Sequence, residues 1–168
     1  MTSGPYRAEI EAAAAAHGLD PDLVAAVVMQ ESNGWASAFR HEADFWEKYL
    51  KRAPLWKDRN PREVSSSYGL MQTMFPVAVE HGFTGQPWEL FAPTVSLEYG
   101  CRVLAKLMAW ARGLYTGLAT NEEAAVRRSA LAAYNGGRGG NGPNGPLRNR
   151  DYADEVLRRY HRIRGDLA

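Results

Sequence analysis

The stretch Val95–Leu114 reads VSLEYGCRVLAKLMAWARGL and decides the fold class of this chain. Its apolar residues recur at alternating intervals of four and three positions, which places them on one face of a helix. These residues are Leu97, Cys101, Leu104, Met108 and Ala111. Because no other segment carries so long a helical pattern, we expect this helix to lie at the centre of the fold. Cys101, the one cysteine, is interpreted as a buried, unreactive thiol.

Shorter helical patterns lie on both sides of this stretch. An alanine-rich segment after Pro5 ends at Gly18. The pair Asp20-Pro21 then predicts the cap and first residue of a helix that runs to about Ser32. Further helices are predicted over residues 41–53 and 76–82, after a capping-box pattern at Thr120 and Glu123, and around residues 152–163.

The chain shows no fixed-period repeat and little sign of strands. Sustained alternation is absent apart from a short hairpin around Ser65 to Gln72. The segment from Gly136 to Pro146 is rich in Gly, Asn and Pro and is predicted to be a mobile loop. A length of 168 residues with 45% hydrophobic content suits one domain over residues 1–168. The prediction is a mainly α, single-domain fold with at most a short β-hairpin.

Composition and charge exclude several classes of function. Lys and Arg total 20 against 19 acidic residues, so the net charge of +1 provides no field for capturing nucleic acid. The arginine-rich last helix is interpreted as a solvated face. The most apolar run, Leu23 to Met29, is too short for a membrane span, and Met1 to Ile10 lacks the pattern of a signal peptide. We therefore expect a protein made in the cytoplasm, without stable membrane insertion.

Glu31 occupies an unusual position on a predicted helix. Val24, Val27 and Val28 define one apolar face, and the next residue on that face is this carboxylate. Burial raises the pKa of a carboxyl group, and a protonated carboxyl is the acid that glycosidic cleavage needs. On spacing alone, a glutamate at a helix end that turns to solvent remains the alternative.

Four short sequences, taken in order, resemble one enzyme family. They are Glu31-Ser32, Gly69-Leu70-Met71-Gln72, Ala133-Tyr134-Asn135-Gly136-Gly137, and Tyr152-Ala153 with Val156. Together they resemble the lytic transglycosylases of the soluble type, in the lysozyme-like superfamily, over roughly residues 17 to 160. The resemblance implies a lysozyme-like fold and cleavage of peptidoglycan glycan strands.

The resemblance also implies roles for individual residues. Glu31 would be the sole catalytic acid and base, and Tyr152 would lie near it. The candidate substrate-binding residues are Ser32, Ser67, Tyr68, Gly69, Met71, Gln72, Tyr134, Asn135 and Tyr152. Ordinary structural roles also fit several of them, with Met71 in the core, Tyr134 and Tyr152 as packing aromatics, and Asn135 at a helix stop.

The reaction implied by the family needs one carboxyl group. Glu31 would protonate the oxygen between N-acetylmuramic acid and N-acetylglucosamine, the muramoyl acetamido oxygen would assist at C1, and Glu31 would then deprotonate the 6-hydroxyl. A 1,6-anhydromuramoyl end would result, with no metal or organic cofactor. The four histidines, at positions 17, 41, 81 and 161, show no metal-ligand spacing.

The segment from Arg40 to Val64 departs from the family's usual pattern and resembles phage-borne members, which suggests an endolysin or virion-associated lysin. It contains Glu42 and Glu63, either of which would supply the second carboxylate of a hydrolytic muramidase. Its aromatic residues, Phe45, Trp46, Tyr49 and Trp56, suit packing or stacking on sugar rings.

Two features of the sequence leave further alternatives. Ser96 stands where the family commonly has asparagine, and we expect it to preserve a helix cap. A non-catalytic wall-binding or virion structural module is the alternative of a different class. We expect peptidoglycan glycan strands as the partner, no nucleic acid, and a monomer.

Overall fold

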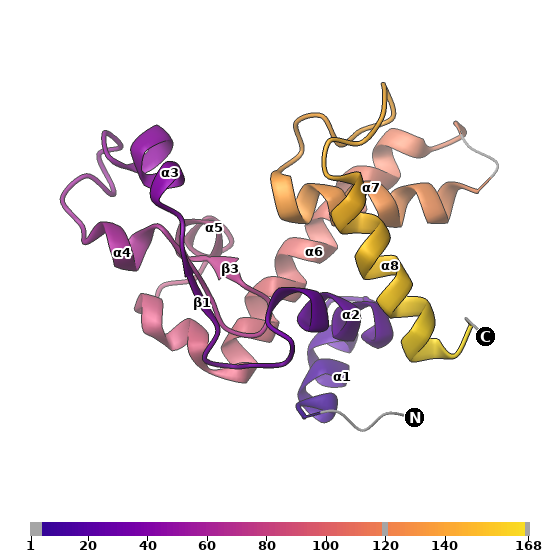
Figure 1. Ribbon diagram of the computed structural model, residues 1–168, viewed down its shortest axis with the longest axis horizontal. Helices are drawn as coiled ribbons and strands as arrows, with labels where there is room; N and C mark the ends of the chain where they lie inside the picture. Colours follow the sequence, from indigo (N-terminus) through magenta and orange to yellow (C-terminus); the bar gives the residue numbers. More distant parts are fainter. Residues whose placement is uncertain (1–4, 119–120, 167–168) are drawn as a thin grey trace.

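The computed structural model describes residues 5–118 and 121–166, and it confirms the prediction of a mainly helical fold. Figure 1 shows two parts joined by α6 (Pro93–Tyr115). The larger part contains α1 (Arg7–Ala16), α2 (Pro21–Glu31), α7 (Glu122–Gly136) and α8 (Arg150–Arg164). The smaller part contains a short sheet with several short helices around it.

Helix α6 is the centre of the fold, as its sequence predicts. Its apolar face is buried along its length, including Leu97, Cys101 and Leu104, which are fully inaccessible to solvent. Helix α7 packs on it most extensively, and α1 also contacts it. The thiol of Cys101 is buried, and burial raises its pKa to about 12. The prediction that this thiol is buried is therefore confirmed.

Helices α2 and α8 pack against each other, although about 120 residues separate them in the chain. The side chain of Asp20 caps α2 by accepting a hydrogen bond from the Asp22 amide at 2.9 Å. The same carboxylate accepts a hydrogen bond from the Tyr160 hydroxyl of α8 at 2.7 Å. The predicted cap of α2 thus also fastens the last helix.

The smaller part contains an antiparallel sheet in the order β1-β2-β3. Its strands are β1 (Phe39–His41), β2 (Ser66–Tyr68) and β3 (Thr73–Met74). Strands β2 and β3 form the predicted hairpin, with Tyr68 opposite Thr73. Strand β1 adds to it, with Phe39 opposite Tyr68 and His41 opposite Ser66. No sequence pattern indicated β1, because a strand of three exposed residues has no alternation to detect.

The helix predicted over residues 41–53 is shorter in the structure and changes type along its length. His41 belongs to β1 and pairs with Ser66 of β2, so the helix begins after it. The segment instead forms α3 (Ala43–Phe45), followed directly by the π-helix η1 (Trp46–Leu50). Three further short helices complete this part: α4 (Pro61–Val64), α5 (Phe75–Glu80) and the 3-10 helix η2 (Pro87–Phe91).

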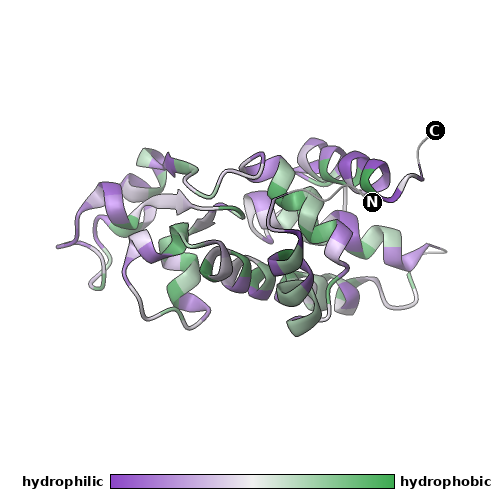
Figure 2. Ribbon diagram, turned by 90° about the horizontal axis from the view of Figure 1, so that it is seen from below, coloured by the Kyte–Doolittle hydropathy of each residue, from purple (hydrophilic) through white to green (hydrophobic). Residues whose placement is uncertain are grey.

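Two hydrophobic clusters form the core of the molecule, one around α6 and one under the sheet. The larger cluster surrounds α6 and contains Val24, Val27, Leu104 and Val156. A smaller one lies under the sheet and contains Leu50, Val64, Tyr68, Phe75, Ala78, Phe83 and Leu90. Figure 2 shows apolar residues concentrated where helices face one another and polar residues on the outside.

The turn between β2 and β3 packs directly on α6. Met71 in this turn is fully buried, and its amide donates to the Ser96 hydroxyl at 3.2 Å. The prediction that Ser96 preserves a helix cap is therefore wrong. The cap position is Ala92, and it makes no side-chain hydrogen bond. Ser96 lies one helical turn after the start of α6, and its hydroxyl accepts a hydrogen bond from the segment between β2 and β3 instead.

The loop after α7 is anchored by a buried side chain. Asn141 has no exposed surface. Its side-chain nitrogen donates to the Gly137 carbonyl at 2.8 Å, and its side-chain oxygen accepts from the Asn149 amide at 3.0 Å. One end of the loop predicted to be mobile is thus joined to its other end. Thr120, the predicted first member of a capping box, lies outside the described residues.

Among the helices in residues 5–118 and 121–166, none is both long and apolar enough to cross a membrane.

The contact between α6 and the turn predicts opposite effects for two glycines of the same helix. A Cβ at Gly100 would lie 2.4 Å from the sulfur and 2.5 Å from the Cβ of Met71, whereas a Cβ at Gly113 would meet nothing within 4 Å. We expect Gly100→Ala to lower the free energy of unfolding by about 1–3 kcal/mol through overpacking. Gly113→Ala should raise it by about 0.5–1 kcal/mol through helix propensity.

Denaturant titration of both variants measures the difference. Equal stabilities for the two variants would mean that Met71 moves away at no cost, and that the turn is not held as tightly as its contacts indicate.

Candidate active site

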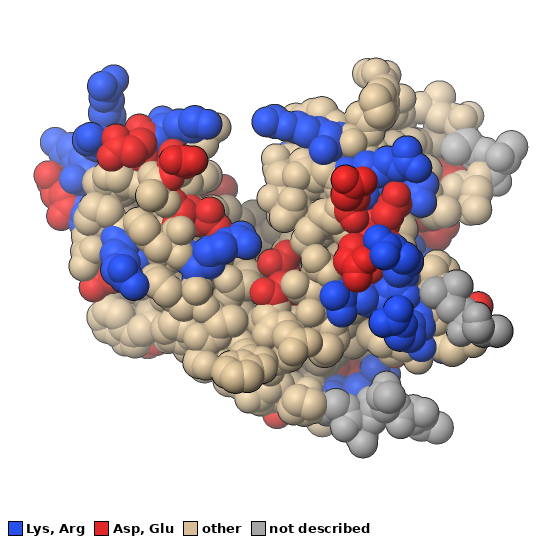
Figure 3. All heavy atoms as spheres, viewed as in Figure 1, with Lys and Arg blue, Asp and Glu red and all other residues tan. Residues whose placement is uncertain are grey.

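A cavity of about 710 Å³ lies between the two parts of the molecule. Figure 3 shows it as a deep hollow, with Lys and Arg side chains at its rims. Its walls come from both parts, with Glu31, Tyr134 and Asn135 on one side and Gln72, Thr73 and Glu42 on the other. A cavity of this volume falls in the range of ligand-binding sites in proteins.

Glu31, the last residue of α2, contributes a partly buried carboxyl group to this cavity. Burial raises its pKa, because the ionised form loses hydration, and the nearby charge of Glu42 raises it further. A hydrogen bond from Tyr152 and the positive charge of Arg40 act in the opposite direction. Burial is the largest of these effects, so the pKa stays above its ordinary value.

Tyr152 of α8 supports the carboxyl directly. Its hydroxyl donates a hydrogen bond to Oε1 of Glu31. Burial and the neighbouring carboxylate raise the pKa of Tyr152, so it stays protonated as a donor. Tyr152 is not among the residues that line the cavity, and it therefore holds the carboxyl from behind.

Ser32 joins the end of α2 to the turn between β2 and β3. Its hydroxyl lies 2.8 Å from the Leu70 carbonyl and 3.1 Å from the Val28 carbonyl. It does not line the cavity. The structure therefore gives this candidate binding residue a structural position, one that fixes the helix end carrying Glu31.

Three more of the candidate residues lie beneath the cavity instead of in its walls. Met71 is fully buried in the larger cluster, as its alternative structural role supposes. Tyr68 is buried in the smaller cluster, and its hydroxyl donates to the Glu63 carbonyl at 2.7 Å. Gly69 has a φ of +71°, and a Cβ there would lie 2.3 Å from the Leu90 carbonyl oxygen. Only glycine fits that position.

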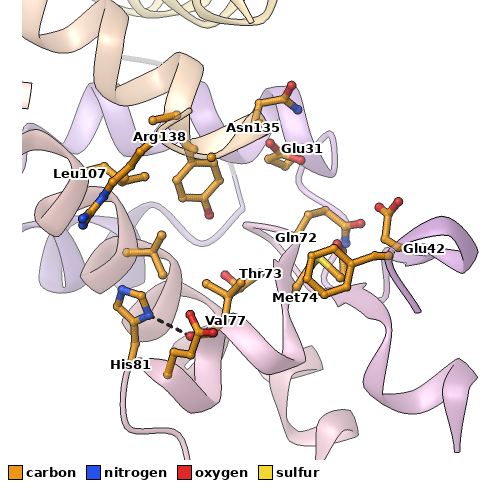
Figure 4. Close-up of a pocket in the computed structure, with 18 of the residues that line it drawn as sticks. Glu31, Glu42, Gln72, Thr73, Met74, Val77, His81, Leu107, Asn135 and Arg138 are labelled. Carbon is orange, nitrogen blue, oxygen red and sulfur yellow. Dashed lines mark hydrogen bonds between the residues drawn. The ribbon is translucent and has the colours of Figure 1, made fainter. Parts of the chain in front are cut away.

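Ser67 and Gln72 do line the cavity. Gln72 has a φ of +47°, an uncommon conformation for a residue with a side chain. Its side-chain nitrogen donates to the carbonyls of Ala38 at 2.9 Å and Gly69 at 3.0 Å, and these bonds stabilise that backbone. Figure 4 shows Gln72 between Glu31 and Glu42 in the cavity.

Tyr134 and Asn135, at the end of α7, form the opposite wall. The Tyr134 hydroxyl donates to the Met71 carbonyl at 2.8 Å, and burial raises its pKa. The Asn135 side-chain oxygen accepts from Asn149 at 2.8 Å. The turn from the sheet and the end of α7 are thereby held together across the floor of the cavity.

The two candidate second carboxylates have different positions. Glu42 lines the cavity together with Glu31 and is paired with Arg40. Glu63 is exposed, accepts a hydrogen bond from the Asn60 side chain at 3.4 Å, and does not line the cavity. Of the two, the structure brings only Glu42 into the same cavity as Glu31.

Several lining residues were not predicted from the sequence. At one end the cavity is bounded by Val77, Leu107 and Arg138, which come from α5, α6 and the loop after α7 (Figure 4). The Arg138 guanidinium lies 5.6 Å from the ring centre of Trp110. Nothing in the sequence around these residues distinguishes them from an ordinary helix face or loop, because their role comes from how α5 and α6 meet.

Glu31 gives the site the chemistry of an acid. Across the residues that the structure describes, no group of three His, Cys, Asp or Glu side chains is arranged to hold a metal ion. One carboxyl group with a raised pKa, supported by a tyrosine and facing an open cavity, can donate a proton to a bound molecule and take one back.

A search of solved structures finds a similar fold in the lytic transglycosylase Slt from Pseudomonas aeruginosa, solved as an inactive glutamate-to-glutamine mutant. The TM-score is 0.64 at 20% sequence identity, and the match covers 96% of this chain. This chain spans only 24% of the length of that protein. No curated protein matches the sequence.

The sequence itself matches a known family over most of its length. Residues 8–154 match the Transglycosylase SLT domain, and they include the first three of the short sequences singled out above and Tyr152-Ala153 of the fourth. The chain therefore belongs to the Transglycosylase SLT domain family.

Proposed function

We propose that this member of the transglycosylase family cleaves the glycan strands of bacterial peptidoglycan between N-acetylmuramic acid and N-acetylglucosamine. The observation that carries the proposal is Glu31, a partly buried carboxyl with a raised pKa that faces a cavity between the two parts of the molecule. The solved relative supports it, since that lytic transglycosylase is inactive as a glutamate-to-glutamine mutant.

One carboxyl group is sufficient for a reaction that does not consume water. Protonated Glu31 gives its proton to the bridging oxygen, the bond from C1 to that oxygen breaks, and the muramoyl acetamido oxygen bonds to C1. The Glu31 carboxylate then takes the proton of the 6-hydroxyl, whose oxygen bonds to C1 and displaces the acetamido oxygen. Glu31 ends protonated as it began, and the product is a 1,6-anhydromuramoyl end.

The contacts of Glu31 suit both halves of this cycle. Burial favours the protonated form that begins the reaction. The Tyr152 hydroxyl donates to the carboxylate formed in the middle and moderates the cost of its charge. The two effects therefore act on the pKa of Glu31 in opposite directions, because burial favours the protonated acid and the tyrosine favours the carboxylate.

We further propose a biological role for the chain, in phage lysis or as part of a virion. Its support is the Arg40–Val64 segment, through which the chain resembles phage-borne members. Lysis of permeabilised bacteria by added protein is the test.

The first prediction concerns the acid itself. We expect Glu31→Gln to reduce release of soluble muropeptides from purified peptidoglycan by at least about a hundredfold, because the amide has no proton to transfer at neutral pH. Retention of cleavage in this variant would rule out the proposed role of Glu31.

The same variant provides a check on folding. The raised pKa of Glu31 means that the wild-type carboxyl contributes stability fully below its unfolded-state pKa and loses it as pH rises through the folded-state pKa. Because glutamine stays neutral, Glu31→Gln should be at least as stable as the wild type at pH 8. Thermal unfolding of both proteins at pH 4 and pH 8 measures this difference.

The second prediction concerns pH dependence. The hydrogen bond from Tyr152 lowers the pKa of Glu31, so Tyr152→Phe should raise that pKa and move the alkaline limb of kcat/KM to higher pH. The charge of Glu42 raises the same pKa, so Glu42→Gln should move the limb to lower pH. Shifts of the two variants in the same direction would contradict this account.

The third prediction separates this reaction from hydrolysis. Glu42 lines the same cavity as Glu31, so it is the candidate second carboxylate of a hydrolytic muramidase. We expect the products to have anhydro ends, which mass spectrometry identifies because they are lighter by one water than reducing ends. Glu42→Gln should keep at least about a tenth of the activity. Products with reducing ends, lost in Glu42→Gln, would establish the hydrolase instead.

A further inference from the structure

The segment between β1 and β2 places an aromatic pair in the wall of the cavity. Phe45, the last residue of α3, and Tyr49, in η1, have ring centres 4.8 Å apart and an angle of 49° between ring planes. Both residues line the cavity that contains Glu31. Phe45 and Tyr49 follow Glu42 in the chain by three and seven residues, within the segment that departs from the family's usual pattern.

Two other aromatic residues of this segment are already used in packing. Trp56 lies against Phe75 with ring centres 5.6 Å apart, and Trp46 packs on the smaller hydrophobic cluster. Neither lines the cavity. Of the four aromatics that the sequence offered for stacking on sugars, the structure therefore leaves Phe45 and Tyr49.

The two rings have different environments. Phe45 is half-buried and also packs on the smaller cluster, which gives the pair a fixed base. Tyr49 is 63% exposed, although the next residue in η1, Leu50, is buried. The Tyr49 ring is thus packed against a neighbour, open to solvent and part of a cavity wall. Such a ring can bind a ligand that has an apolar face.

Polar groups line the same cavity as the two rings. Arg40 and Glu42 form an ion pair that lines the same cavity, and the arginine side chain is 60% exposed. Figure 4 shows Glu42 beyond Gln72, so the polar wall continues outward from the acid. A pyranose ring offers a complementary combination, with C–H groups on its face for the rings and hydroxyl groups on its edge for charged side chains.

We propose that Phe45 and Tyr49 form a distal saccharide subsite that binds a sugar ring of the glycan strand away from the cleaved bond. This inference rests on the proposed function, because it takes the glycan strand as the occupant of the cavity. The occupant of the subsite is a pyranose stacked on the exposed Tyr49 ring, with Phe45 holding that ring in place. The subsite adds affinity for strands long enough to extend from Glu31 to the aromatic pair.

The test uses Tyr49, because its exposure means that truncation leaves the core intact. We expect Tyr49→Ala to raise KM for long, soluble glycan strands about three- to tenfold with kcat nearly unchanged, as loss of an interaction made equally in the ground and transition states requires. Tyr49→Phe keeps the ring and should restore the original KM. Short fragments that do not extend to the pair should be cleaved equally by all three proteins.

Leu55→Ala is the matched control, since Leu55 belongs to the same segment, is 65% exposed and does not line the cavity. An unchanged KM in Tyr49→Ala, or the same KM change in Leu55→Ala, would overturn the subsite. A loss of kcat without a change in KM would also overturn it, because it would indicate a disturbed acid instead of lost binding.

Binding measurements separate this inference from the proposed catalytic role. In the Glu31→Gln background, chito-oligosaccharides of increasing length serve as probes, and their Kd is compared with and without Tyr49→Ala. We expect the difference of about three- to tenfold to appear only above a threshold length. Equal Kd values at every length contradict the subsite whether or not Glu31 is the acid, whereas cleavage retained by Glu31→Gln contradicts only the catalytic role.

Discussion

The turn formed by Gly69 to Gln72 is held from several sides at once, and the geometry of the cavity depends on it. The Leu70 carbonyl accepts from Ser32, the Met71 amide donates to Ser96, and the Met71 carbonyl accepts from Tyr134. The end of α2 and the helices α6 and α7 are thereby hydrogen-bonded to two consecutive residues of the turn. Because backbone groups buried at this depth need partners, a shift of the turn would break several bonds together. The two parts of the molecule consequently meet at a defined separation.

The position of the turn also determines the environment of Glu31. The bond between Ser32 and Leu70 fixes the end of α2, where the carboxyl emerges, and Tyr152 of α8 contacts the carboxyl from the other side. Desolvation of the carboxyl and its hydrogen bond to tyrosine both follow from this packing. The raised pKa is therefore a property of how α2, α8 and the turn assemble, and no single neighbouring charge produces it.

The spacing of apolar residues predicted those features of the structure that depend on a single helix. The long helix α6 and the capped start of α2 follow from spacing within a helix, and the structure agrees. Spacing alone left open whether Glu31 faces inward or turns to solvent, and in the structure Glu31 lines the cavity. Spacing could not separate Met71, which is buried, from its neighbour Gln72, which lines the cavity, because the positive φ of Gln72 breaks any regular alternation. The difference between Glu42 and Glu63 likewise depends on where β1 and α4 are placed.

Several residues of the short sequences that resemble the family serve assembly instead of contact with a ligand. Ser32, Gly69 and Met71 build the joint under the cavity, and none of them lines it. Much of the wall comes from other segments, including Phe45, Tyr49 and Arg138. Residues in the joint are constrained by several simultaneous contacts, whereas exposed wall residues are constrained by few. Differences in glycan preference between members of the family should therefore arise mainly in these wall segments, with the acid and its support left unchanged.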